Sequence, residues 1–348
     1  MRQITRPIRR SSVCSIAVRY FCFGIAGCLL LALPACGRSG AQKEPLTIFY
    51  ASSLEGALAR WSEMFREGEG IEVRAEASGS QDAARKVSEL GRAADLVLVA
   101  DYHIIEWLLV PSCAQWQILF AGNEIVLAHS EQSRYAAELT ADNWREILLR
   151  PDVRIARADE NLAPIGYQTL QAWMLSDFAA GIPTTDTQGS VAAQLRARIP
   201  PSLVRPDIRS LAALLGLQVD YVFLFRNIAH EHNLKYLRLP DSINLSNPDR
   251  AADYARAAVT IIKSTRGAAG ETVVVRGSPI FYGLTIPTSA RRPDVAERFV
   301  KMILSEAGQN VLEDLGFSVP RPPRALGFEA APKSLQPLVK AWHEDPKN

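Results

Sequence analysis

The sequence predicts an α/β protein in which two lobes are joined by two strands that cross between them. Strand patterns alternate with helical patterns from residue 46 onward, which is typical of parallel sheets with helices on their faces. The apolar stretch 125–128 is predicted to leave the first lobe, and 280–286 is predicted to return to it. A small ligand would then lie between the lobes, where strand ends and helix N-termini meet.

The first lobe is predicted from two strands that each lead through a serine turn into a helix. Strand 46–50 is followed by Ser52 and Ser53 and by apolar residues at helical spacing to about residue 66. Strand 72–77 is followed by Ser78, Gly79 and Ser80 and by a helix to about residue 90. Strands at 96–100 and 117–120 complete this part of the chain.

The second lobe is predicted from a further alternating set. It comprises helices at 141–150, 165–178 and 226–231 and strands at 153–158, 221–225 and 235–239. Residues 181–209 read as a surface excursion with a short helix near 191–198, and 257–262 forms a hairpin with 273–275 through a turn at 267–270. After the return strand, one long amphipathic helix is expected at 294–315, followed after Val319 by a proline-rich tail that packs on the surface or stays loose.

The first 35 residues carry the pattern of a secretory signal. They contain five arginines and no acidic residue, and the apolar run 21–35 is too short to span a membrane comfortably. The sequence Leu33-Pro34-Ala35-Cys36 resembles a bacterial lipobox, which predicts lipid on Cys36, a polar tether over 37–45 and attachment to a membrane. An uncleaved anchor and cleavage near Cys36 without lipid are the alternatives, and all three predict an exported, periplasmic or cell-surface protein.

Charge and cysteine content exclude several classes of function. Removing residues 1–35 changes the formal net charge from +2 to −3, because five arginines leave and no acid does. No basic stripe or nucleic-acid motif remains, so nucleic acid is not an expected partner. Three cysteines leave with the signal and Cys36 would be acylated, so Cys113 remains alone, without a disulfide framework or a metal-ligand spacing.

The two serine turns are the strongest functional signal. A strand–turn–helix unit presents free backbone N–H groups and the positive end of a helix dipole, and serine hydroxyls add further donors. The alternative is that Ser52 forms a capping box with Glu55 and that Ser80 caps its own helix. Capping is the commoner role for one such turn, whereas the pair brings the two interpretations about even. Neither turn contains a catalytic base, so binding without conversion is predicted, and no enzyme activity.

Ordered segments across nearly all of residues 46–325 resemble a known family. They include Glu76-Ala-Ser-Gly-Ser80, Ala100-Asp101-Tyr102, Gly166-Tyr167, Asp220-Tyr221, Asn244-Leu-Ser-Asn-Pro-Asp249 and Pro279-Ile-Phe-Tyr-Gly-Leu-Thr-Ile-Pro287. This order resembles the periplasmic tungstate/molybdate-binding proteins of ABC uptake systems, in their archaeal-type branch. The resemblance implies the two-lobed type II periplasmic-binding-protein fold with two crossover strands. It also implies that the hydroxyls of Ser53 and Ser80 donate hydrogen bonds to the oxyanion.

The chain departs from that family at residues that would approach the metal. The family places an aspartate where this chain has Ala163 and a glutamate where it has Gln218, and these carboxylates expand the metal's coordination toward octahedral. A tyrosine of the family falls on Phe225. We therefore expect ligand contacts from Ser53, Ser80, the helix start at Ala163, the Gln218 amide and Tyr221, with a tetrahedral anion held by hydrogen bonds alone. A drift to sulfate or phosphate is the alternative, with the Gln218 carbonyl oxygen meeting the proton of phosphate.

The sequence thus predicts an extracytoplasmic lipoprotein that captures tungstate or molybdate and delivers it to an ABC permease. Lobe 1 is expected to comprise 46–126 and 281–345, and lobe 2 to comprise 127–280. The protein is expected to be a monomer without a cofactor, and without a metal beyond the bound oxyanion. A sensor or enzyme domain on the same fold is the rival, since fold does not fix function. An enzyme would need acid–base groups, for which Asp82, Asp101 and Asp220 are the nearest candidates.

Overall fold

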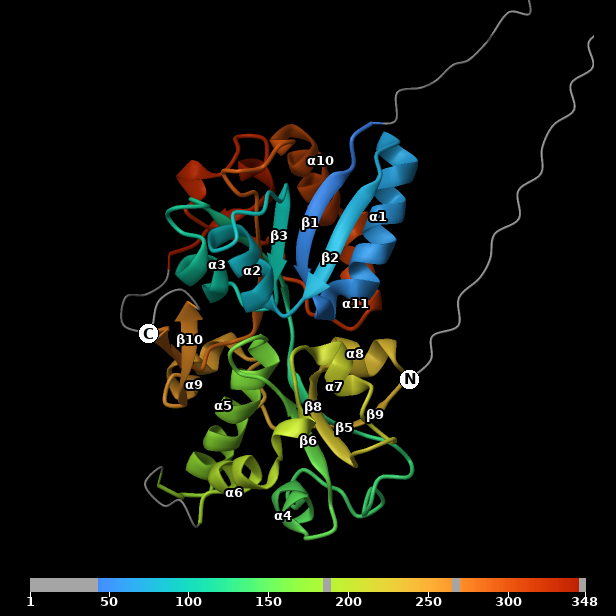
Figure 1. Cartoon of the computed structure of the whole chain (residues 1–348), viewed down its shortest axis with the longest axis vertical. Helices are drawn as coiled ribbons and strands as arrows, with labels where there is room; N and C mark the ends of the chain where they lie inside the picture. Colours follow the sequence, from blue (N-terminus) through green and yellow to red (C-terminus); the bar gives the residue numbers. More distant parts are fainter. Residues whose placement is uncertain (1–42, 184–188, 265–269, 344–348) are drawn as a thin grey trace, which may run out of the picture. The chain divides into compact units, whose positions relative to one another are not determined.

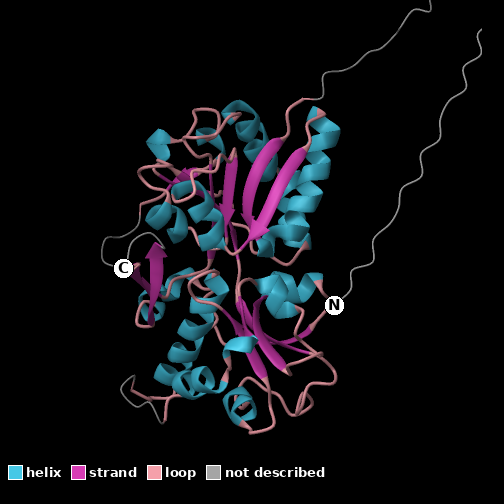
Figure 2. Ribbon diagram, in the orientation of Figure 1, coloured by secondary structure: helices cyan, strands magenta, loops and turns pink. Residues whose placement is uncertain are grey.

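Two mixed β-sheets organise the chain, one in each half of the molecule (Figures 1 and 2). The computed structural model describes residues 43–183, 189–264 and 270–343. The predicted signal, Cys36, most of the tether and most of the turn at 267–270 lie outside these residues. In the part described, no helix is both long and apolar enough to cross a membrane.

The larger sheet has seven strands in the order β14-β13-β4-β12-β3-β1-β2. Its strands are β1 (Leu46–Ala51), β2 (Val73–Ser78), β3 (Leu96–Val99), β4 (Gln117–Gly122), β12 (Phe281–Thr285), β13 (Arg324–Leu326) and β14 (Lys340–Ala341). Of the two alternatives for the proline-rich tail after Val319, packing on the surface holds where it adds β13 and β14 to the sheet edge. The sequence did not predict these strands because both are very short.

Side chains along the central strands alternate between two hydrophobic clusters, one on each face of this sheet. Ile48 and Tyr50 of β1 belong to one cluster with Trp61 of α1 (Glu55–Glu69), and Phe49 belongs to the other. Successive strand residues point to opposite faces, so helices must cover both. The first face is covered by α1, α10 (Pro293–Leu304) and α11 (Glu306–Asp314), and the second by α2 (Ser80–Ser88) and α3 (His103–Leu108).

The smaller sheet has five strands in the order β7-β6-β8-β5-β9. They are β5 (Ile125–His129), β6 (Ile155–Ala158), β7 (Val204–Arg205), β8 (Tyr221–Phe225) and β9 (Lys235–Arg238). Its helices are α4 (Trp144–Leu149), α5 (Pro164–Ala179), α6 (Val191–Arg198), α7 (Ile208–Ala212) and α8 (Arg226–Glu231). The short helix α9 (Ala251–Tyr254) precedes a separate hairpin of β10 (Ala258–Ser264) and β11 (Glu271–Arg276).

In each sheet, the strand that arrives from the other sheet runs antiparallel to both of its neighbours. β5 is antiparallel to β8 and β9, and β12 is antiparallel to β3 and β4. The other central strands of each sheet are mutually parallel, so their carboxyl ends lie along one edge. The first crossing passes through Asn123 and Glu124, and Asn123 N–H donates to Ile280 O of the second (3.3 Å). The two connections therefore lie side by side.

Two predicted boundaries differ from the structure. Ile125 and Val126, assigned to lobe 1 by the sequence, pair within the smaller sheet, so the chain crosses two residues earlier than expected. The single helix predicted over 294–315 is two helices, α10 and α11. Ser305 between them has an extended backbone (ψ 162°), and its hydroxyl caps α11 by accepting from Gly308 N–H. Apolar residues continue on the buried face through this break, which hid it from the periodicity.

Candidate functional site

A small cavity lies where the carboxyl ends of both sheets' parallel strands meet. Its volume is about 10 Å³, which is enough for one group of the size of a water molecule. Its wall from the larger-sheet half is formed by Ala51, Ser52, Ser53, Ser78, Gly79, Ser80 and Ala100. Its wall from the smaller-sheet half is formed by Ala163, Pro164, Ile165, Ile208 and Phe225.

Ser53 lies in the one-turn 3₁₀ helix η1 (Ser52–Leu54), between β1 and α1. Its side chain is buried, and its Oγ accepts a hydrogen bond from the Tyr282 hydroxyl at 2.9 Å. A buried hydroxyl needs partners, and here the Tyr282 hydroxyl already uses one of the two lone pairs of the Ser53 oxygen. The remaining hydroxyl hydrogen is available to the cavity.

Ser80 opens α2 and is equally buried. Its Oγ accepts from the backbone N–H of Ala100, the residue that follows β3, at 2.9 Å. Because a backbone amide can only donate, Ser80 must use its own hydrogen elsewhere. The two serines therefore offer the same thing to the cavity, an O–H donor whose oxygen already accepts from the protein.

The interpretation of Ser52 and Ser80 as helix caps is wrong. The residue at the N-cap of α1 is Leu54 and that of α2 is Gly79, and neither helix start has a side-chain cap. The serines lie inside the first helical turn, where backbone N–H groups lack an acceptor within the helix. The starts of η1–α1, α2, α5 and the short helix α7 border the cavity. Their aligned dipoles make it electropositive without a formal positive charge.

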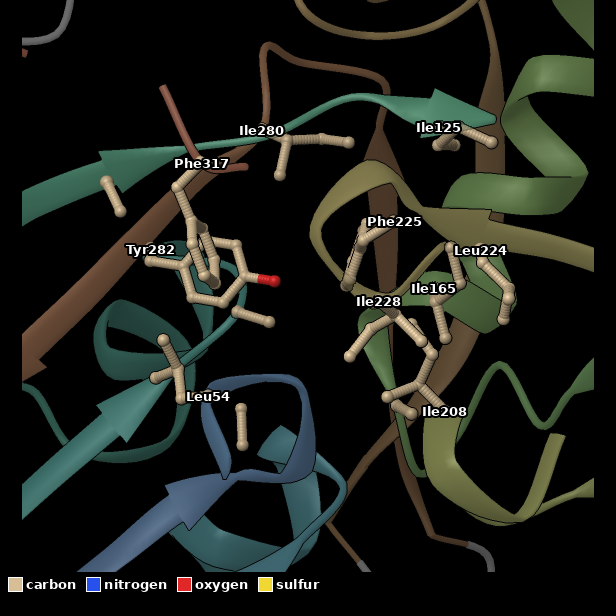
Figure 3. Close-up of a cluster of buried hydrophobic side chains, with 14 of the residues drawn as sticks. Leu54, Ile125, Ile165, Ile208, Leu224, Phe225, Ile228, Ile280, Tyr282 and Phe317 are labelled. Carbon is tan, nitrogen blue, oxygen red and sulfur yellow. The ribbon is translucent and has the colours of Figure 1, made fainter. Parts of the chain in front are cut away.

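The opposite wall is apolar apart from its backbone. Ala163 is the N-cap of α5, and Pro164 and Ile165 are its first two residues. The Ile165 and Phe225 side chains face the same region in the close-up (Figure 3). None of the lining residues, all within the described part of the chain, has an ionisable side chain. The site therefore offers hydrogen-bond donors and dipoles, and neither a carboxylate nor a general base.

Two residues predicted for the site lie elsewhere. Gln218 is exposed and borders a different depression, together with Ser130, Arg134 and Arg154. Tyr221 begins β8, and its hydroxyl donates to Arg134 O. The cavity is at the other end of this strand, where Phe225 ends it. Residues before a strand lie at its amino end, so neither Gln218 nor a glutamate in its place could reach the cavity.

Hydrogen bonds join the two halves beside the cavity. Tyr167 of α5 donates through its hydroxyl to Asp101 Oδ2 at 2.6 Å, and both side chains are buried. The other oxygen, Asp101 Oδ1, lies 2.8 Å from His103 Nδ1 and accepts from His103 N–H at 3.0 Å. Burial raises the pKa of Asp101, but attraction to His103 and hydrogen bonds from His103 and Tyr167 outweigh it, so its pKa lies below the usual range.

A second set of contacts links α2 to the loop that leads into α5. Gln81 Nε2 donates to Glu160 O at 3.1 Å, and Arg85 Nη1 donates to Asn161 O at 2.9 Å. Gly79 approaches the same loop, because a Cβ on it would lie 2.0 Å from Leu162 O. The helix start that bears Ser80 is thus fixed against the helix start that bears Ala163.

The sequence analysis missed the residues behind the cavity wall. Tyr282, Asn123 and Asn227 form a buried hydrogen-bonded group around Ser53, and Asp101 pairs with Tyr167. Asp101 and Tyr167 stood in segments of the family resemblance, but their pairing across 66 positions had no local signal. The sequence offered one indication of their importance: Asn123 and Tyr282 lie beside or within the predicted crossing strands, near the junction of the lobes.

Comparison with known proteins gives a consistent picture. The sequence model of the family described as bacterial extracellular solute-binding protein matches residues 46–318. An uncharacterized solute-binding protein of Petrotoga mobilis is 36% identical over 302 residues, covering 86% of this chain and 91% of that protein. The molybdate/tungstate-binding protein WtpA of Pyrococcus abyssi is 34% identical over 341 residues, covering 91% of this chain and 95% of its own.

Solved structures share the fold at low sequence identity. The periplasmic molybdate-binding protein of Azotobacter vinelandii aligns with a TM-score of 0.52 at 16% identity, over 79% of this chain and 99% of that one. The sulfate-binding protein SubI of Mycobacterium tuberculosis aligns with a TM-score of 0.57 at 14% identity, over 86% and 94%. These similarities confirm the predicted two-lobed type II periplasmic-binding-protein fold with its two crossover strands.

Proposed function

Because the chain belongs to the bacterial extracellular solute-binding protein family, we propose that it captures a fully deprotonated tetrahedral oxyanion and delivers it to an ABC permease. Molybdate or tungstate is the first candidate ligand, supported by the name of the relative in Pyrococcus abyssi. The observation that carries the proposal is a wall of serine hydroxyls and helix starts without any ionisable side chain.

The chemistry of the wall matches an anion that carries no proton at neutral pH. Molybdate, tungstate and sulfate are acceptors only, so every contact they make requires a donor. Fixed neutral dipoles in a water-excluded site stabilise such a charge without a counter-ion. In this arrangement Ser53 and Ser80 donate from one lobe, and the backbone N–H groups at the start of α5 donate from the other.

Phosphate is the least favoured of the candidate anions. At neutral pH it retains a proton, which must donate to an acceptor once the site closes. The acceptor expected from the sequence was the Gln218 carbonyl oxygen, but Gln218 lies at the far end of β8. Sulfate remains the second candidate, since it is deprotonated and needs no metal ligand from the protein.

The same wall argues for binding without turnover. No lining residue can serve as general acid, general base or carboxylate nucleophile. The proposal includes export and a lipid on Cys36, which holds the protein at a membrane as a monomer beside its permease. Mass spectrometry of the N-terminal peptide of the mature protein tests the lipid.

Calorimetric titration of the purified protein with tungstate, molybdate, sulfate and phosphate tests the function. We expect tungstate or molybdate to bind most tightly and phosphate most weakly. A Ser53→Ala/Ser80→Ala variant should lose at least a hundredfold in affinity, because each charge-assisted hydrogen bond contributes about 1.5–3 kcal/mol. Gln218→Ala is the matched control and should bind as the wild type does. Unchanged binding by the serine variant, or binding of none of the four anions, would contradict the proposal.

The geometry of the bound metal separates hydrogen-bonded capture from coordination by the protein. The lining offers no carboxylate, so tungsten should keep four oxygen neighbours. X-ray absorption of the tungstate complex measures this number directly. Six-coordinate tungsten would reject capture by hydrogen bonds alone.

A further inference from the structure

We propose that Tyr282, oriented by Asn123, is a positioning residue that keeps the Ser53 hydroxyl a donor toward the cavity and thereby selects against anions that carry a proton. This inference rests on the proposed function and names the group that enforces its ligand class. Neither residue lines the cavity, so both act through Ser53.

The four side chains involved come from both crossings and both lobes. Tyr282 lies in β12, Asn123 in the other crossing, Asn227 in α8 and Ser53 in η1. Tyr282, Asn123 and Asn227 are buried along with Ser53. In Figure 3 the Tyr282 hydroxyl points away from Phe317, toward the side on which Phe225 and Ile228 lie.

The direction of every hydrogen bond in this group follows from one backbone amide. Glu124 N–H donates to Asn123 Oδ1 at 2.9 Å, which fixes the orientation of the Asn123 amide. Asn123 Nδ2 therefore faces the other way and donates to Asn227 Oδ1 at 2.9 Å and, at 3.4 Å, to the Tyr282 hydroxyl oxygen. With its oxygen accepting, Tyr282 donates to Ser53 Oγ at 2.9 Å.

The second branch of the group holds the backbone of Ser53. Because Asn227 Oδ1 accepts from Asn123, its Nδ2 is turned toward Ser53 O, to which it donates at 2.9 Å. The same nitrogen donates to Glu231 Oε1 at 2.7 Å. Both the backbone and the hydroxyl oxygen of Ser53 are thus bound by amides and hydroxyls of fixed direction.

Tyr282 can donate at neutral pH. Burial raises its pKa well above the usual tyrosine value, which outweighs the opposing hydrogen bonds to Ser53 and Asn123. The Tyr282 hydroxyl thus keeps its hydrogen and donates it to Ser53 Oγ.

The consequence is a proton filter at the cavity. Ser53 Oγ and Ser80 Oγ both accept from the protein, one from Tyr282 and one from Ala100 N–H. A ligand that bears a proton would have to use the second lone pair of one of these oxygens, which is the weaker acceptor because the oxygen already accepts from the protein. Removing the Tyr282 hydroxyl frees the first lone pair of Ser53 Oγ, whereas the Ala100 amide continues to hold Ser80.

The test variant is Tyr282→Phe, which changes little else. The Tyr282 ring packs edge-to-face on Phe120, Phe225 and Phe317, and phenylalanine retains those contacts. Calorimetry at pH 7 should show the ratio of tungstate affinity to phosphate affinity shift by about five- to tenfold toward phosphate. If Tyr282 had a purely structural role, the substitution would weaken the binding of both anions equally and leave the affinity ratio unchanged.

Two further variants assign the effect to the hydroxyl chain. Tyr254→Phe removes another buried hydroxyl, one bonded to Asp241 O and Asn247 N–H, and should keep the wild-type ratio. In a Ser53→Ala background, Tyr282→Phe should no longer shift the ratio, because the oxygen on which it acts is gone. If Tyr282→Phe fails to fold, Asn123→Ala should shift the ratio in the same direction by a smaller factor.

The outcomes separate this inference from the function on which it rests. A wild-type protein that binds none of the oxyanions overturns both. A wild type that prefers tungstate, with a Tyr282→Phe variant of unchanged ratio, overturns the proton filter alone. A ratio shift that persists in the Ser53→Ala background would also overturn it.

Discussion

At the scale of single residues, the role of each serine depends on which of its polar atoms already makes a hydrogen bond within the protein. Ser53 and Ser80 are each bound through their oxygen by a protein donor, and this leaves one free hydrogen on each. Their sequence context favoured capping and ligand binding about equally. The choice between them depends on strands β3 and β12, which are distant in sequence, so no local pattern could have made it.

Ser80→Ala isolates one of these donors. Binding of tungstate should weaken about ten- to a hundredfold, because a charge-assisted hydrogen bond is lost. The protein should also lose about 1–3 kcal/mol of unfolding free energy, because the buried Ala100 N–H loses its acceptor. Calorimetry and urea denaturation measure the two effects. Ser88→Ala, on the same helix but outside the cavity, is the control, and an equal loss of affinity in it would argue against a direct contact.

Ala163→Asp places a carboxylate where the wall now has none. At pH 7 we expect sulfate binding to fall more than tenfold, since two like charges meet in a poorly screened site. The affinity for tungstate should fall less than the affinity for sulfate if tungsten accepts the new carboxylate oxygen as a ligand. The neutral Ala163→Asn variant controls for size. Equal losses for both anions in Ala163→Asp would show that the metal accepts no oxygen from this position.

At the scale of elements, strand and helix positions in the smaller sheet followed closely from the sequence. Strand β8 and helices α6 and α8 begin and end at the predicted residues, because apolar runs and polar breaks coincide there. The error concerned Gln218. Its placement in the site ignored that only the carboxyl end of β8 faces the cleft, a rule that the strand assignment already implied.

The contact between Tyr167 of α5 and Asp101, two residues after β3, should make the stability of the fold sensitive to acid. A depressed carboxyl pKa stabilises the folded state above the ordinary aspartate value near 4 and ceases to do so as the pH falls through the lower folded value. The unfolding free energy of the wild type should therefore be larger than that of the Asp101→Asn variant from pH 7 to about 5. The difference between the two should shrink below about pH 4. Urea denaturation across this range measures it, and exposed Asp142→Asn is the control. A difference that grows in acid would contradict the assignment.

At the scale of the whole molecule, the two lobes meet through buried contacts that only a closed arrangement allows. Tyr167–Asp101, Gln81–Glu160 and Asn227–Ser53 all join one sheet's half to the other. The exposed pair of Arg209 and Glu55 also spans the cleft, at 3.0 Å, but such surface pairs contribute little. Closure is thus held by buried hydrogen bonds beside the cavity.

Gly79→Ala should prevent this closure without harming either lobe. The backbone of Gly79 (φ −62°, ψ 150°) suits any residue, but a Cβ there would collide with Leu162 O of the facing lobe. We expect normal folding, tungstate affinity reduced at least tenfold, and a larger radius of gyration with ligand, measured by small-angle X-ray scattering. Gly68→Ala, where a Cβ meets nothing within 4 Å, is the control. A ligand-bound variant as compact as the wild type would contradict the prediction.

The meeting of Gly79 with Leu162 also bears on how a bound ion would leave. Main chain lies against main chain there, so no side chain can swing aside as a gate. We expect the halves to separate before a bound ion passes this contact, so the rate of their separation would limit dissociation. A transporter that separates the halves would then set the timing of release.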